Sequence, residues 1–358
     1  MSPETIKGFR NLILRNLPKR IYFMTFAIRN KISNLLVTGV ALASLTGITP
    51  LSAQATESNL EPTADNRITD VHFRSMEIQG IDIAYREAGD PSKPALLLLH
   101  GFPTSSHMFR ELIPKLADKY HVIAPDYPGF GASAMPALND FEYSFANFAN
   151  VVNELLEKKS IGKYAMYLMD YGAPVGFRVF AKHPDRVSGF IIQNGNAYDE
   201  GLESFWDPIK AYWANPSAKN RENLRSSLLT IDATKWQWTH GIPDENLELV
   251  SPDNWHHDQY LLDRPGNKDI QLAMFLSYAS NVTEYPKWQA LFREHQPPAL
   301  IVWGKGDYIF PATGAHPYEN DLESVEKYIL DTGHFALETH LDFISHKIDA
   351  FLERELER

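Results

Sequence analysis

Short, continuous runs of apolar residues recur along most of this sequence, and they constrain its fold more than any other feature. The run Ala95-Leu96-Leu97-Leu98-Leu99 is typical of a strand buried on both faces of a parallel sheet. Similar strand-like segments lie at 121–125, 164–168, 188–193, 299–303 and 324–330. Segments with helical periodicity separate most of them. This alternation predicts an α/β fold with a mostly parallel central sheet and helices on both of its faces.

Two further features complete the predicted fold. Residues 75–79 and 81–86 alternate between apolar and polar side chains around Gly80, which predicts an antiparallel hairpin at one edge of the sheet. Residues 199–290 are rich in Trp and Tyr and contain no strand-like run. We therefore expect an α/β core formed by 71–198 and 291–358, with a helical cap inserted at 199–290 over the carboxyl ends of the strands, where it would cover a pocket.

The first part of the chain has the features of a targeting segment. Basic residues precede an apolar stretch that ends near Ile48, and the small-residue site Ala53-Gln54-Ala55 follows. This order predicts a signal peptide over 1–55, with Met24 as a possible start, and therefore an exported, periplasmic or secreted protein. An uncleaved membrane anchor is the alternative, although the apolar stretch is short for a bilayer span. The polar segment 56–70 is predicted to be a linker.

Composition limits the partners and the chemistry. The net charge of −11 and the absence of a basic stripe argue against nucleic acid as a partner. The chain has no cysteine, which excludes thiolate catalysis and zinc sites with sulfur ligands. The neighbouring side chains of His256 and His257 would point in different directions from a helix, so we expect no metal site there. We also expect no cofactor. The sequence predicts no oligomeric state.

Three polar residues follow three of the predicted strands. Asp170 comes directly after 164–169 and precedes a segment that opens a helix, Asp307 follows 299–303, and His334 follows 325–330. Nucleophile, acid and histidine in this order are typical of a hydrolytic triad on an α/β sheet. Taken singly, Asp170 resembles an N-cap residue, but the three together favour catalysis. Asp331 is an alternative for the acid, although Asp307 matches the position after a strand.

An aspartate at the nucleophile position has a definite chemical consequence. Its carboxylate can attack an electrophilic carbon and form an ester between enzyme and substrate. His334 would then deprotonate the water that hydrolyses this ester, while Asp307 orients the imidazole. Leu168 departs from expectation, because the position two before the nucleophile is usually small, and either a relaxed turn or space in the helix behind it must accommodate the larger side chain.

Four segments carry a resemblance to known enzymes: His100-Gly101-Phe102-Pro103, Asp170-Tyr171-Gly172, Trp303 to Asp307, and Gly333-His334-Phe335. Over nearly all of 75–355 the chain resembles the epoxide hydrolases and haloalkane dehalogenases of the α/β-hydrolase superfamily. The resemblance implies an oxyanion hole formed by the backbone N–H groups of Phe102 and Tyr171, which would stabilise the charge formed when water attacks the ester.

The same resemblance bears on the leaving group. Epoxide hydrolases place two cap tyrosines over the nucleophile, and Tyr278 resembles one of them while Tyr212 resembles the other less securely. Dehalogenases usually have a tryptophan after the nucleophile, where this chain has Tyr171, and many have a halide-binding asparagine where it has Phe102. A small apolar epoxide is therefore the expected substrate, with Tyr278 and Tyr212 as the acids that open the ring.

Several alternatives remain open. Tyr198, Tyr260 and Tyr285 compete for the ring-opening role, and the cap tryptophans are expected to line the boundary between cap and core. The chain could instead release halide from a haloalkane or haloacid, hydrolyse an ester or lactone, or bind a ligand without turnover, since a fold does not determine a function.

Overall fold

The computed structural model describes residues 70–356. The predicted signal peptide lies outside these residues, and so does all of the predicted linker except Asp70. Within the described part of the chain, no helix combines the length and apolar character that a membrane crossing requires.

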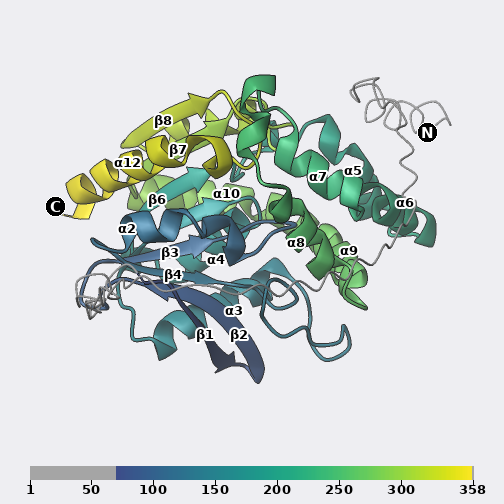
Figure 1. Cartoon of the computed structure of the whole chain (residues 1–358), viewed down its shortest axis with the longest axis horizontal. Helices are drawn as coiled ribbons and strands as arrows, with labels where there is room; N and C mark the ends of the chain where they lie inside the picture. The colour runs from purple at the N-terminus through teal and green to yellow at the C-terminus, as the bar shows by residue number, and fades with distance from the viewer. Residues whose placement is uncertain (1–69, 357–358) are drawn as a thin grey trace, which may run out of the picture. The chain divides into compact units, whose positions relative to one another are not determined.

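The centre of the described chain is an eight-stranded sheet with the order β1-β2-β4-β3-β5-β6-β7-β8 (Figure 1). Its strands are β1 (His72–Ile78), β2 (Ile81–Ala88), β3 (Ala95–Leu99), β4 (His121–Pro125), β5 (Tyr164–Met169), β6 (Val187–Gln193), β7 (Ala299–Gly304) and β8 (Val325–Leu330). Strand β2 is antiparallel to both β1 and β4, and every other pairing is parallel. The predicted mostly parallel sheet with an edge hairpin is therefore confirmed.

Helices cover both faces of the sheet. On one face, α3 (Phe145–Lys158) and α4 (Gly172–Lys182) pack together, and α10 (Ala279–His295) packs on α4. On the other face, α12 (Leu337–Leu356) packs against α2 (Leu112–Leu116) and against β6 and β7. A short helix, α11 (Tyr318–Asp321), precedes β8 and contacts α10.

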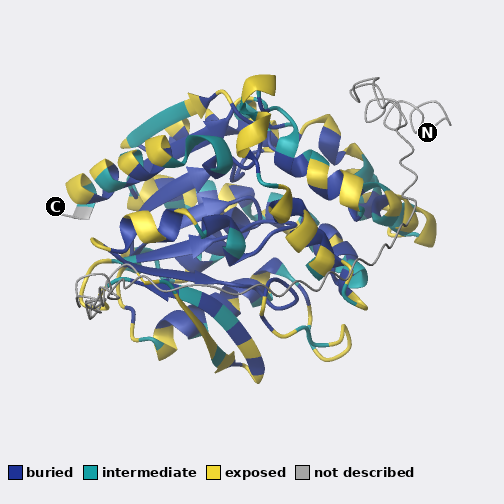
Figure 2. Cartoon of the chain, viewed as in Figure 1, coloured by how far each residue is buried: buried dark blue, intermediate teal, exposed yellow. Residues whose placement is uncertain are grey.

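The apolar strand runs explain why both faces need cover. Successive side chains of a strand point to opposite faces. In β3, Leu97 and Leu99 therefore join the core on the α3 and α4 side, whereas Leu96 and Leu98 join the core on the α2 and α12 side. Figure 2 shows the resulting pattern, in which the central strands are buried and exposed residues gather on the outer sides of the helices.

The chain between β6 and β7 is helical throughout, apart from short connections. Besides α10 it contains α5 (Asp207–Ala214), α6 (Ala218–Leu228), α7 (Ile231–Thr239), α8 (Pro252–Leu262) and α9 (Asn267–Ser277), with short 3₁₀ turns before α5 and before α8. Ser217, Thr230 and Ser251 begin α6, α7 and α8, and each side chain accepts a hydrogen bond from a backbone N–H of the first helical turn. These local caps define short helices that turn back on one another beside the sheet (Figure 1).

Candidate active site

The three residues that follow β5, β7 and β8 converge on one point. Nδ1 of His334 lies 2.7 Å from Oδ2 of Asp307, and Nε2 of His334 lies 3.7 Å from Oδ2 of Asp170. All three side chains are buried. They come together because the carboxyl ends of neighbouring parallel strands meet at one edge of a sheet. The carboxylate that contacts the histidine belongs to Asp307, and no contact joins Asp331 to His334 among the described residues.

Asp170 occupies a sharp turn between β5 and α4. Its backbone has a positive φ of 50°, which a residue other than glycine adopts only when its surroundings impose it. The turn lifts the carboxylate above the end of the strand, and its Oδ1 accepts hydrogen bonds from the backbone N–H groups of Phe102 (2.7 Å) and Tyr171 (2.6 Å). The two donors predicted for an oxyanion hole therefore already bind one oxygen of Asp170.

The loop that supplies the Phe102 donor fits closely against the carboxylate. A Cβ atom at Gly101 would overlap the Asp170 side chain, so this position requires glycine. His100 lies beneath the loop, where its Nδ1–H donates to the Gly101 carbonyl (2.9 Å) and its Nε2 accepts from the Tyr127 backbone N–H (3.3 Å). Burial lowers the pKa of His100 to about 4, which keeps the ring neutral in this role.

Leu168 fits in the tight turn because of the helix behind it. A Cβ atom at Gly176 in α4 would lie closer than 3.0 Å to the Leu168 side chain, a separation that real Cβ atoms essentially never show. The missing side chain of Gly176 therefore provides the space that Leu168 fills. Of the two explanations considered from the sequence, space left by the helix is the one that the structure supports.

The protonation of the site follows from its burial. Loss of hydration raises the pKa of Asp170 to about 6, although the positive charge of His334 and the two backbone N–H donors oppose this shift. Burial alone would lower the pKa of His334, but the Asp307 carboxylate and then Asp170 outweigh burial and raise it above its usual value. The two groups therefore favour a charged pair at neutral pH.

Asn194 is a member of the site that the sequence analysis missed. It directly follows β6, its Nδ2 donates to Oδ2 of Asp307 (2.6 Å), and its Oδ1 accepts from the Gly304 backbone N–H (3.0 Å). The Ile309 backbone N–H donates to the other oxygen of Asp307 (2.8 Å). The Asp307 carboxylate is thus fixed in its rotamer. The signal available in the sequence was a polar residue just past a central strand. In the structure Asn194 has a positive φ of 45°, which asparagine tolerates.

The two tyrosines predicted to open an epoxide lie in different surroundings. Tyr278 is fully buried, and its ring centroid lies 4.3 Å from that of Trp206 and 6.1 Å from that of Tyr171. Its hydroxyl lies 3.5 Å from the hydroxyl of Tyr285. Tyr212 is buried in α5. Neither Tyr278 nor Tyr212 is among the residues that line the cavity beside Asp170.

The competing tyrosines are also placed. The Tyr198 hydroxyl donates to Oδ2 of Asp321 (2.8 Å), and Tyr260 is 75% exposed. The Tyr285 hydroxyl accepts from Nδ2 of Asn196 (3.1 Å). Of these three, only Tyr285 contacts Tyr278.

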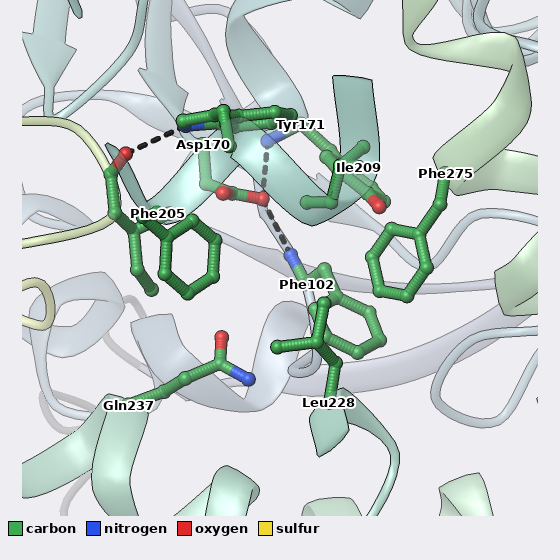
Figure 3. A pocket seen from close by; sticks show the side chains of 10 residues that line it. Phe102, Asp170, Tyr171, Phe205, Ile209, Leu228, Gln237 and Phe275 are labelled. Atoms are coloured by element: carbon green, nitrogen blue, oxygen red, sulfur yellow. Dashed lines mark hydrogen bonds between the residues drawn. The ribbon is translucent and has the colours of Figure 1, made fainter. Parts of the chain in front are cut away.

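A small cavity lies between Asp170 and the cap (Figure 3). It is lined by Phe102, Asp170, Tyr171, Phe205, Trp206, Ile209, Leu228, Gln237, Phe275 and Ile309. The cavity volume is about 20 Å³, and a single water occupies roughly 10–15 Å³ of such a cavity. A substrate with several heavy atoms therefore requires the surrounding side chains to move. Among residues 70–356, no group of three or more His, Asp or Glu side chains is arranged to hold a metal ion.

The architecture and the site now define the class of protein. Residues 94–341 match the family model described as alpha/beta hydrolase fold. This chain belongs to that family and is an enzyme of the α/β-hydrolase type.

Individual relatives indicate which branch of the α/β-hydrolase family this chain resembles. An uncharacterized hydrolase of Saccharomyces cerevisiae is 43% identical over 280 residues, which cover 77% of this chain and 95% of that protein. A haloalkane dehalogenase of Bradyrhizobium diazoefficiens is 34% identical over 123 residues, or 34% of this chain and 39% of the dehalogenase. The solved structure of the epoxide hydrolase CorEH covers 80% of this chain and 99% of its own, with a TM-score of 0.64 and 21% identity. The predicted resemblance to the epoxide hydrolase and haloalkane dehalogenase branch is confirmed.

Proposed function

We propose that this enzyme hydrolyses a small, largely apolar epoxide to a diol through a covalent ester on Asp170. The observation that carries the proposal is that the two carboxylate oxygens of Asp170 have different hydrogen-bond partners. Oδ1 accepts both backbone N–H bonds, while Oδ2 faces His334 and has no hydrogen-bond donor among the described residues. Oδ2 is therefore the oxygen available to attack carbon, and Oδ1 already occupies the place of the ester carbonyl oxygen.

In the first step, Oδ2 of Asp170 attacks a ring carbon and forms a carbon–oxygen ester bond. The ring carbon–oxygen bond breaks, its electron pair goes to the ring oxygen, and that oxygen takes a proton from Tyr278. Burial raises the pKa of the Tyr278 phenol well above its usual value, so the phenol carries this proton at neutral pH. The step requires the substrate to displace the side chains that separate Tyr278 from the cavity.

In the second step, Nε2 of His334 takes a proton from water, and the hydroxide attacks Cγ of Asp170. The developing negative charge falls on Oδ1, where the Phe102 and Tyr171 N–H groups stabilise it. The ester bond then breaks, and the departing diol oxygen takes the proton from His334. The regenerated Asp170 carboxyl releases its proton, which restores the Tyr278 phenol.

The charge of Asp170 changes between the two steps, and the pKa of His334 changes with it. While Asp170 is an anion, its charge helps to raise the pKa of His334 above its usual value, which favours the protonated imidazole. Formation of the ester removes that negative charge from a position 3.7 Å away. The pKa of His334 therefore falls and the imidazolium releases its proton to solvent, which leaves a neutral imidazole that can accept a proton from water. When the Asp170 carboxylate is regenerated, His334 takes a proton from solvent again.

The test is the intact mass of the His334→Gln variant after mixing with a panel of small epoxides. Without its base the enzyme is expected to form the ester but not to hydrolyse it, which adds the whole mass of the epoxide. The matched control is the double variant Asp170→Asn, His334→Gln, which should gain no mass. Equal labelling of both variants, or no labelling of either, would contradict the proposal.

Halide release is the second candidate, and the partial match to a haloalkane dehalogenase favours it. The same variant would then gain the mass of a haloalkane less one hydrogen halide, and halide would appear in solution. Acid formed from simple esters without any adduct would instead indicate ester or lactone hydrolysis. Ligand binding with no product would indicate a binding protein.

A further inference from the structure

Gln237 in α7 is the polar side chain that the cap contributes to the wall of the cavity. In Figure 3 its amide points into the cavity from the side opposite the Asp170 carboxylate. Gln237 is only 5% exposed, yet within residues 70–356 its amide group makes no hydrogen bond. An amide that faces a cavity and has no hydrogen-bond partner in the surrounding protein is suited to bind a ligand there.

The other cap residues around the cavity do not offer such a group. Phe205, Ile209, Leu228 and Phe275 are apolar. Trp206 has an N–H, but its Nε1 already donates to the Ile309 carbonyl (2.7 Å).

The helix that carries Gln237 is fixed relative to the site. Nε1 of the next residue, Trp238, donates to Oδ2 of the buried Asp258 (2.9 Å). The Trp238 ring stacks on Phe335, the residue after His334, with 3.7 Å between the ring centroids. The Gln237 backbone is therefore held against the same loop that positions the histidine. Rigid support of this kind is what a substrate-contacting group requires.

The line along which Asp170 attacks carbon indicates what the Gln237 amide would bind. When Oδ2 of Asp170 displaces a group from carbon, the bond that breaks lies on the far side of that carbon, roughly in line with the attacking oxygen. The departing atom is therefore directed across the cavity, toward the wall that contains Gln237 (Figure 3).

We propose that the amide N–H of Gln237 donates a hydrogen bond to the departing atom and stabilises its growing negative charge. This inference rests on the proposed attack by Asp170. An amide does not release its proton, so an epoxide oxygen still receives its proton from another group, whereas a halide leaves as an anion with the hydrogen bond alone.

The experiment measures how fast the covalent adduct forms in a single turnover. In the His334→Gln background, Gln237→Met keeps the length of the side chain and removes the donor, and should slow adduct formation about 10- to 100-fold, as expected for loss of one hydrogen bond to a charged group. The matched control, Leu224→Met, changes a buried residue of α6 that does not line the cavity and should alter the rate by less than about threefold. Gln237→Leu serves as a second variant, and circular dichroism verifies that each variant is folded.

A four-carbon terminal epoxide and the corresponding 1-bromoalkane are run in parallel. Slowing by Gln237→Met with either compound supports the inference, and the compound affected identifies the departing atom as oxygen or halide. Adduct formation at the parent rate in folded Gln237→Met and Gln237→Leu overturns the inference but leaves Asp170 as the nucleophile. Failure of the His334→Gln parent to form any adduct overturns the proposed function itself.

Discussion

The contact between Leu168 and Gly176 predicts a strong energetic coupling beneath the nucleophile turn. In Gly176→Ala the new Cβ would lie less than 3.0 Å from the Leu168 side chain and 3.3 Å from Cδ1 of Leu99. Leu168 and Leu99 are fully buried, so neither can move into solvent. Overpacking of this kind destabilises a core by about 1–3 kcal/mol. Alanine in place of glycine inside a helix stabilises it by about 1 kcal/mol. We therefore expect Gly176→Ala to lower the free energy of unfolding by about 0–2 kcal/mol.

In a Leu168→Ala background, Gly176→Ala is expected to have the opposite effect on the free energy of unfolding. Leu168→Ala alone should destabilise the protein by about 2–5 kcal/mol, because it leaves a cavity. With the obstructing methyl group gone, Gly176→Ala should stabilise the protein by about 1 kcal/mol. The coupling free energy between the two positions is therefore expected to be about 1–3 kcal/mol in magnitude.

Urea unfolding followed by circular dichroism gives the four free energies of unfolding. Gly162→Ala is the matched control, since a Cβ there meets no atom within 4 Å. Its effect should not depend on residue 168 by more than about 0.5 kcal/mol. If the coupling between Gly176→Ala and Leu168→Ala is as small as that of the control, the account of how Leu168 fits the turn is wrong.

Three other predictions follow from the site and from the predicted signal peptide. Because burial raises the pKa of Asp170 to about 6 and attack needs the carboxylate, ester formation should fall about tenfold per pH unit below that value. In His334→Gln this fall in the rate of ester formation should begin at a higher pH, because the cation that lowers the pKa of Asp170 is gone. Rapid-quench mass spectrometry across pH measures the rate, and a pH dependence that does not move would refute the reasoning. Asp307→Asn should slow ester hydrolysis about 10³- to 10⁴-fold by favouring the wrong imidazole tautomer, yet leave ester formation within about tenfold, so stopped-flow measurements should show the ester accumulating. Cleavage after Ala55 is expected on export, and N-terminal sequencing of exported protein that still contains the predicted signal peptide would contradict it.

The sequence alone predicted the type of sheet and the residues that meet in the candidate active site. The strand-like runs, such as 95–99, predicted a mostly parallel sheet because burial on both faces requires continuous apolar segments. The positions of Asp170, Asp307 and His334 after strands predicted that they would meet, since parallel strands end at one edge. Both inferences depend only on local pattern and on the geometry of a sheet.

Other features depended on contacts between segments far apart in the chain. Asn194 contacts Asp307, which lies 113 residues away, and Gly176 makes room for Leu168 across a helix–strand interface. Tyr278 was singled out by resemblance, but the structure places its ring against Trp206 and leaves Gln237, which nothing in the sequence distinguished, facing Asp170. Periodicity determines which face of an element is apolar. Which side chain of a cap helix reaches a cavity depends on how the helices pack against one another, and only the tertiary structure decided that.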